Sequence, residues 1–207
     1  MPAESELARL LEHPAIWRGR SAARTEVHPT GFGALDDCLP GRGWPRTGLM
    51  EILVSRFGSG ELNLLLPVLA MLTGRPSARW CAWVTPPLEP FAPALLAHGV
   101  VLDRVLIIRA PTVMWAFEQS LGSGACDAAI AWARRPRARE IRRLQLAAER
   151  GRTLGVLFRP ASAAQESSPA ILRLILEPAA QGLRVTFLKS RGGARGSIDV
   201  ACRMAGN

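Results

Sequence analysis

Strand-length and helix-length apolar segments alternate through the middle of the chain. The short segments are nearly all apolar, and the longer ones carry apolar residues at helical spacing. Strands that are apolar throughout are typical of a parallel sheet covered by helices on both faces. The pattern therefore predicts an α/β fold, with strands at 49–54, 80–85, 105–109, 128–132 and 154–159 and helices at 61–73, 90–98, 112–122 and 138–150.

The pattern changes after residue 160. Residues 171–176 and 183–189 predict two strands joined by a turn, which add a C-terminal β-hairpin to the largely parallel sheet. Residues 190–207 begin with a Gly- and Arg-rich stretch and predict a flexible tail.

The first residues have a different character. Residues 5–13 predict a short amphipathic helix, because apolar side chains recur on one stripe while glutamates lie elsewhere. The stripe consists of Leu7, Leu10 and Leu11, and Ile16 and Trp17 extend the apolar character beyond the end of the helix. We expect three parts in the chain: an N-terminal helix and arm (1–28), a core (29–189) and the tail (190–207).

The bulk composition fits one folded domain. The chain has 207 residues, of which 48% are hydrophobic and 21% charged, so a single large core is expected. No signal peptide and no membrane-spanning run is recognisable, and we expect a cytoplasmic protein. The four cysteines are scattered without metal-site spacing, so we expect reduced thiols, no metal and no cofactor.

The net charge is +9, and Lys189 is the only lysine. An arginine surplus favours an acidic partner, which could be a nucleic acid. The arginine bias is also typical of a GC-rich genome, so both explanations stay open.

A loop with glycines follows the first predicted core strand, where a nucleotide-binding protein holds phosphates. That chemistry needs two glycines five residues apart, then a lysine, then a hydroxyl residue that binds magnesium. Here the corresponding positions do not fit, since Glu61 and Leu62 follow the last glycine. The loop residues are Ser55, Gly58, Ser59, Gly60, Glu61 and Leu62. We predict that this loop is an inactive turn.

The carboxyl ends of the other strands also lack catalytic acids. The strand 128–132 ends in Trp132, and Asp127 lies at its opposite end. Two prolines follow Thr85, and nothing in the sequence places the nearby Glu89 as a base. We therefore expect no enzyme activity, with a divergent ATPase as the alternative from the enzyme class.

Several stretches resemble known families. Three segments resemble the entry into the RecA core: Pro29-Thr-Gly-Phe-Gly-Ala-Leu-Asp36 and the residues 39–46 and 48–53. The resemblance is closer to the ImuA family of RecA-like mutasome accessory proteins and to the related SulA family of cell-division inhibitors. It lies in the segments 13–20, 60–67, 83–87, 125–132, 142–149 and 188–193.

The two families imply different partners. SulA-like proteins resemble the chain from about residue 48 to 160, whereas segments 13–20 and 171–193 fit only ImuA. The ImuA resemblance implies a RecA-like three-layer core without a functional phosphate loop. It also implies binding to RecA and to an ImuB-type inactive polymerase homologue, which together assist an error-prone polymerase in translesion synthesis. The alternative is a SulA-like inhibitor that binds FtsZ.

Two basic surfaces are candidates for partner or weak DNA contact. The first follows the strand 128–132 and continues along the next helix, where Leu146 lies among arginines; an ordinary solvated helix face is the alternative. Its residues are Arg134, Arg135, Arg137, Arg139, Arg142, Arg143, Leu146 and Arg150. The second comprises Arg184, Lys189, Arg191 and Arg195, and has no aromatic residue on which a base could stack.

The N-terminal apolar stripe is a third candidate surface. The resemblance to RecA implies that Leu7, Leu10, Leu11, Ile16 and Trp17 dock on RecA in the manner of a neighbouring subunit. Packing of the stripe on its own domain is the alternative.

Overall fold

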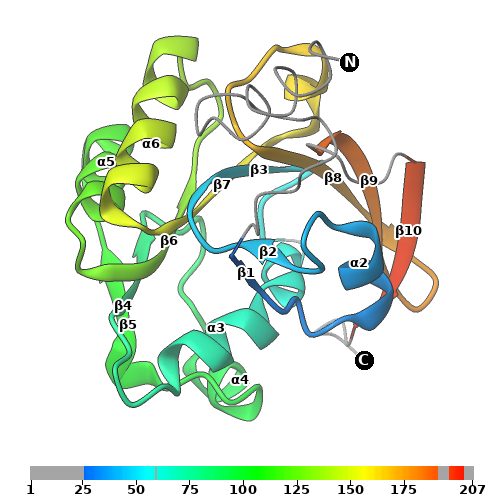
Figure 1. The fold of residues 1–207 in the computed structure, drawn as a ribbon, viewed down its shortest axis with the longest axis horizontal. Helices are drawn as coiled ribbons and strands as arrows, with labels where there is room; N and C mark the ends of the chain where they lie inside the picture. Colours follow the sequence, from blue (N-terminus) through cyan, green and yellow to red (C-terminus); the bar gives the residue numbers. More distant parts are fainter. Residues whose placement is uncertain (1–25, 59, 191–195, 203–207) are drawn as a thin grey trace, which may run out of the picture.

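The computed structural model describes residues 26–58, 60–190 and 196–202. The fold is mixed α/β, with one large sheet covered by helices on both faces and a small two-stranded ribbon beside it (Figure 1). The large sheet consists of β3 (Gly48–Val54), β4 (Trp80–Val84), β5 (Val105–Ile108), β6 (Cys126–Trp132), β7 (Leu154–Pro160), β8 (Leu172–Ala179), β9 (Gly182–Ser190) and β10 (Gly196–Ala201). The ribbon pairs β1 (Val27–His28) with β2 (Trp44–Pro45).

The described helices flank this sheet. They are α2 (Gly33–Cys38), α3 (Leu66–Thr73), α4 (Ala92–Ala97), α5 (Val113–Gly122) and α6 (Ala138–Gly151), together with the 3-10 turns η1 (Glu61–Leu64), η2 (Leu102–Arg104) and η3 (Ala161–Gln165). Within the described part of the chain, none of the helices has the length and apolarity to cross a membrane.

The large sheet is mostly parallel. Its strand order is β10-β9-β8-β3-β7-β6-β4-β5, and the six strands from β8 to β5 run in the same direction. The strands β8, β9 and β10 are paired antiparallel. The carboxyl ends of β3, β4, β6 and β7 therefore meet at one edge of the sheet, where ligands bind in open α/β folds.

Each face of the sheet has its own apolar core. Met50, Ile52 and Val54 of β3 pack on the side of α2, α3 and α4, whereas Leu49 packs on the side of α5 and α6. This alternation follows from the two-residue period of a strand. Because both faces are covered, β3 is buried at every position.

The structure confirms the predicted parallel strands and the C-terminal hairpin to within a few residues. The predicted helix 61–73 is divided into η1 and α3. Pro67 lacks the N–H that an uninterrupted helix would need at that position, so the α-helix begins only at Leu66.

The chain ends differ from the predicted division. Residues 196–201 of the predicted flexible tail form β10, and β9 extends to Ser190. The buried Val200 explains the strand, since its side chain packs into the core while its neighbours are exposed. Val27 and His28, assigned to the N-terminal arm, pair with β2.

Candidate functional site

The loop between β3 and η1 lies at the carboxyl edge of the sheet. Gly58 and Gly60 have φ values of 78° and 95°, a left-handed conformation that favours glycine. Ser55 and Arg56 are exposed, and Ser59 lies outside the described residues. Leu62 packs against the core. Its alkyl side chain is at the position where a phosphate loop has the hydroxyl residue that binds magnesium.

Glu61 turns its carboxylate back into this loop. The residue is 3% exposed. Its Oε1 accepts hydrogen bonds from the backbone N–H of Gly58 at 2.8 Å and from the indole N–H of Trp132 at 3.0 Å. The protein's own carboxylate thus takes the backbone N–H of Gly58 that a phosphate would otherwise accept. A second anion about 4 Å away would be repelled by about 4 kcal/mol at an effective dielectric constant near 20.

Aromatic side chains fill the space beside Glu61. Trp132 stacks on Phe158 with ring centroids 5.3 Å apart, and Trp83 lies tilted against Trp132 at 6.4 Å. These residues come from β6, β7 and β4, and all three are buried. They fix the orientation of the indole that binds Glu61.

The acidic residues considered from the sequence lie elsewhere. Asp127 is at the amino end of β6, as its position in the sequence indicated. Glu89 is exposed and forms an ion pair with Arg109.

The arginine surface runs from the end of β6 along α6. Glu140 caps the N-terminus of α6, since its carboxylate accepts a hydrogen bond from the backbone N–H of Arg137 at 2.6 Å. The apolar face of α6 buries Ile141, Leu144 and Ala148 against the sheet. All the residues predicted for this surface are exposed: Arg134, Arg135 and Arg137 before the helix, and Arg139, Arg142, Arg143, Leu146 and Arg150 on it.

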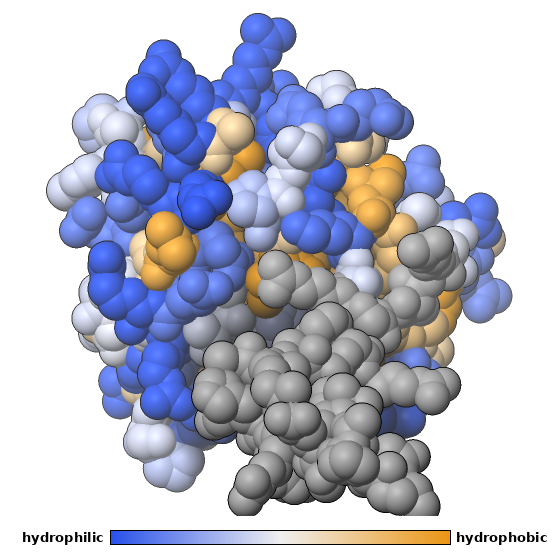
Figure 2. All heavy atoms as spheres, turned by 45° about the horizontal axis from the view of Figure 1, so that its top comes forward, coloured by the Kyte–Doolittle hydropathy of each residue, from blue (hydrophilic) through white to orange (hydrophobic). Residues whose placement is uncertain are grey.

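Few of these charges are compensated. Arg143 pairs with Glu118 of α5, and the guanidinium of Arg134 lies 5.4 Å from the centre of the Phe57 ring. Arg139 and Arg142 form no ion pair with a described carboxylate. Leu146 is 54% exposed among them. The left side of Figure 2, where α5 and α6 lie, is mostly hydrophilic with small apolar patches. This surface can attract an acidic partner.

Comparisons with known proteins show which families the chain is related to. No family model matches it. It is 37% identical to the cell division inhibitor SulA of Edwardsiella piscicida over 114 residues, which make up 52% of this chain and 67% of that protein. It is 27% identical to Protein ImuA of Caulobacter vibrioides over 217 residues, which cover 90% of this chain and 88% of that protein. The chain is an ImuA-like member of the SulA-related family.

The crystal structure of SulA from Pseudomonas aeruginosa matches with a TM-score of 0.46 and 22% identity, covering 54% of this chain and 98% of that one. The ImuA match extends beyond the segment shared with SulA.

In this ImuA-like chain the second basic patch is only partly described. The Nζ of Lys189 donates a hydrogen bond to the backbone oxygen of Ser168 at 2.8 Å, so it joins β9 to the loop before β8. Arg191 and Arg195 lie outside the described residues. The N-terminal docking residues also lie outside them: Leu7, Leu10, Leu11, Ile16 and Trp17.

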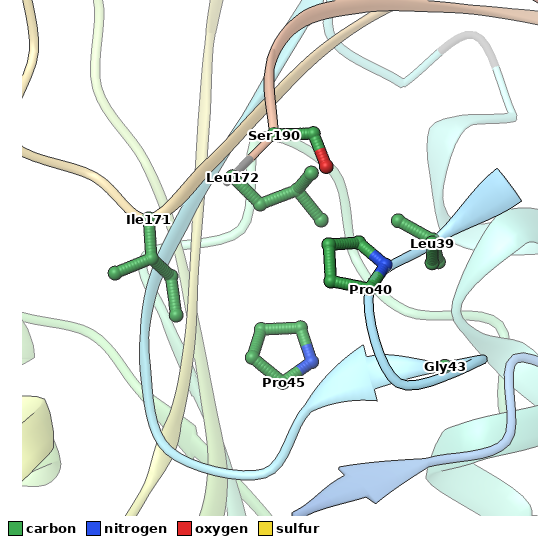
Figure 3. A pocket seen from close by; sticks show the side chains of 7 residues that line it. All are labelled: Leu39, Pro40, Gly43, Pro45, Ile171, Leu172 and Ser190. Carbon is green, nitrogen blue, oxygen red and sulfur yellow. The ribbon is translucent and has the colours of Figure 1, made fainter. Parts of the chain in front are cut away.

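A pocket of about 190 Å³ lies beside β2 and the start of β8 (Figure 3). Its walls come from the segment between α2 and β2 and from the ends of β8 and β9. The lining residues are Leu39, Pro40, Gly43, Pro45, Ile171, Leu172 and Ser190.

A buried ionic cluster was not predicted. The carboxylate of Glu51 on β3 accepts hydrogen bonds from Arg159 of β7 at 3.2 Å and from Arg173 of β8 at 2.7 Å. Arg173 also donates to the backbone oxygens of Ala163 and Glu166, which fixes η3 over the sheet. The feature of the sequence that could have indicated this cluster is the presence of Glu51, Arg159 and Arg173 within otherwise apolar strands. Such clusters specify strand neighbours, since an unpaired buried charge is costly.

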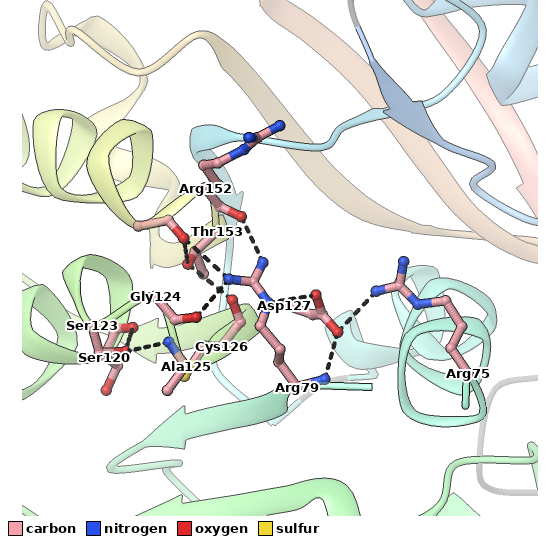
Figure 4. Close-up of polar contacts among 11 residues, drawn as sticks. Arg75, Arg79, Ser120, Ser123, Gly124, Ala125, Cys126, Asp127, Arg152 and Thr153 are labelled. Carbon is pink, nitrogen blue, oxygen red and sulfur yellow. Dashed lines mark hydrogen bonds and ion pairs between the residues drawn. The ribbon is translucent and has the colours of Figure 1, made fainter. Parts of the chain in front are cut away.

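A second unpredicted cluster joins the loops at the amino edge of the sheet (Figure 4). Arg79 binds Asp127 and donates to the backbone oxygens of Gly124, Gly151 and Arg152. Arg75 also pairs with Asp127, at 2.8 Å. Burial alone would raise the pKa of Asp127, but the Arg79 hydrogen bonds and the two positive charges outweigh it and lower the pKa.

The cysteines are free thiols in the described residues. Burial raises the pKa of Cys81 to about 12, so this thiol stays protonated. Among the described residues, no three His, Cys, Asp or Glu side chains are grouped as a metal site requires.

Proposed function

We propose that the chain is a non-catalytic adaptor of the bacterial SOS response, built on a RecA-like domain that does not hydrolyse ATP. It binds RecA and an ImuB-type inactive polymerase homologue, and so supports or regulates error-prone translesion synthesis. The family relation and the RecA-like stretches of the sequence support this function.

The observation that carries the proposal is the position of the Glu61 carboxylate. A phosphate loop presents free backbone N–H groups and a lysine to the nucleotide. Here Glu61 accepts the Gly58 N–H itself and is held by Trp132. The loop therefore stabilises its own structure, which leaves contact surfaces to perform the function.

The α6 arginine surface is the second support. Its charges are exposed and largely uncompensated, and Leu146 adds an apolar contact. A protein partner with an acidic, partly apolar surface fits this arrangement. DNA would meet the charges but gain little from Leu146.

The test is a pull-down of purified RecA by the immobilised chain, with and without single-stranded DNA. The wild type should retain RecA in at least one condition. If α6 is the contact, the double variant Arg139→Glu/Arg142→Glu should retain at least tenfold less RecA. Arg104→Glu is the matched control, since Arg104 is exposed on η2. Failure of the wild type to retain RecA in both conditions contradicts the adaptor function.

Direct DNA contact has a separate signature. Affinity for single-stranded DNA should fall steeply with salt, and the logarithmic salt slope should decrease by about 0.7 for each α6 arginine removed that contacts phosphate. A slope that Arg142→Ala leaves unchanged excludes this arginine from phosphate contact.

The second candidate function is SulA-like inhibition of cell division through FtsZ. The 37% identity to a cell division inhibitor favours it. Stoichiometric amounts of the chain should then block FtsZ polymerisation in a light-scattering assay. Unchanged polymerisation argues against this alternative and leaves the adaptor function intact.

A further inference from the structure

The pocket in Figure 3 has the chemistry of a site for an apolar side chain. Pro40 and Pro45 face Ile171 and Leu172 across it, and no lining residue is charged. Pockets that hold drug-sized ligands have volumes of about 300 to 1,000 Å³. This pocket has about 190 Å³, enough for one or two side chains.

One polar atom distinguishes the pocket from a plain apolar groove. The hydroxyl of Ser190 is buried and has no hydrogen-bond partner among the described residues. A hydroxyl oxygen can accept a hydrogen bond, and an indole N–H can only donate one. A tryptophan therefore fits the pocket better than a leucine or isoleucine, because its ring fills apolar space while its N–H pairs with the hydroxyl.

The described chain begins beside this pocket. Val27 pairs with Pro45, which is a wall residue, and Arg46 binds both the backbone oxygen and the carboxylate of Glu26. Twenty-five residues precede Glu26, and they include the apolar stripe that ends at Ile16 and Trp17. The nine residue-to-residue steps from Trp17 to Glu26 can span up to about 30 Å. Tethering at this distance gives an effective concentration in the millimolar range, so weak docking suffices.

We propose that this pocket is the docking site of the chain's own N-terminal segment, residues 1–25, with the Trp17 indole in the pocket and its N–H donating to Ser190. A docked segment hides its apolar stripe, so another protein reaches the stripe only by displacing it. The docking does not depend on which partners the protein binds.

Limited trypsin digestion of the full chain tests this docking, because Arg18 and Arg20 follow Trp17 closely in the sequence. Mass spectrometry follows cleavage after these residues. Trp17→Ala should accelerate cleavage at least tenfold, and Ser190→Phe, which fills the pocket, should do the same. Because both variants remove the same contact between Trp17 and the pocket, combining them should give no further acceleration of cleavage. Trp115→Ala is the matched control: Trp115 is 59% exposed on α5, and its loss should leave cleavage unchanged.

Trp17→Ala changes a residue outside the described core, so its result stands even if Ser190→Phe perturbs folding. Cleavage of Trp17→Ala at the wild-type rate overturns the proposal. Wild-type protection that increases with protein concentration also overturns it, since the segment would then occupy the pocket of a second copy.

Discussion

At the scale of single residues, Glu61 determines the chemistry of the loop after β3. The sequence already showed that a glutamate, and not the lysine of a phosphate loop, follows Gly60. Its partner was not, because Trp132 lies 71 positions away and meets Glu61 only once β3 and β6 share a sheet.

The acceptor role of Glu61 can be separated from its charge. Glu61→Ala should lower the free energy of unfolding by about 1–3 kcal/mol, because the buried Trp132 N–H loses its acceptor. Glu61→Gln should cost less, since an amide oxygen still accepts. Urea unfolding followed by tryptophan fluorescence measures both. Equal losses in the two variants would show that the hydrogen bonds to Glu61 are not what stabilises the loop.

His28 makes stability depend on pH. Burial, followed by the positive charges of Arg75 and Arg46, lowers its pKa from 6.5 to about 4. The unfolded chain therefore binds a proton more readily between these values, and stability should fall as pH decreases from about 6.5 to 4. Above pH 6.5 His28 is neutral in both states and contributes no pH dependence.

The measurement is the urea midpoint of the wild type and of His28→Asn at pH 7 and pH 5. The variant should lose less stability over this interval. An equal loss would assign the pH dependence to other groups. Asp127 acts at lower pH, because its lowered pKa preserves stability until the pH falls below the ordinary carboxyl range.

At the scale of elements, helices α5 and α6 are in close contact at their C-terminal ends. A Cβ added to Gly151 would lie 1.9 Å from the backbone oxygen of Leu121, so only glycine fits there. The sequence indicated a glycine at a helix end, but not that the contact with α5 requires it.

Gly151→Ala should destabilise the fold by about 1–3 kcal/mol or more, because the two helices must separate. Gly33→Ala is the matched control, since a Cβ at Gly33 of α2 meets nothing within 4 Å and its φ is not left-handed. The control should be neutral or slightly stabilising. Thermal unfolding compares the two, and similar midpoints would contradict the steric argument.

The same scale shows which elements a sequence pattern can predict. The buried parallel strands were predictable because each is an unbroken apolar run of strand length. The strand β10 was not, since its few alternating residues follow a Gly- and Arg-rich stretch and become a strand only by pairing with β9. The α6 surface was predictable from helical spacing alone.

At the scale of the whole molecule, Glu61 and three aromatic side chains pack together at the sheet edge that could hold a ligand, while α6 presents largely uncompensated positive charge. The family relation adds the ImuA and SulA proteins as functional precedents. The central claim is that the protein acts through these surfaces without binding nucleotide at the loop.

Isothermal titration of Mg²⁺ and ATP into the full chain tests this claim most directly. The wild type should give no saturable heat at millimolar nucleotide, because the Glu61 carboxylate occupies the loop amide. Saturable binding to the wild type that disappears in Gly60→Val or Glu61→Ala would contradict the claim and assign the loop to nucleotide.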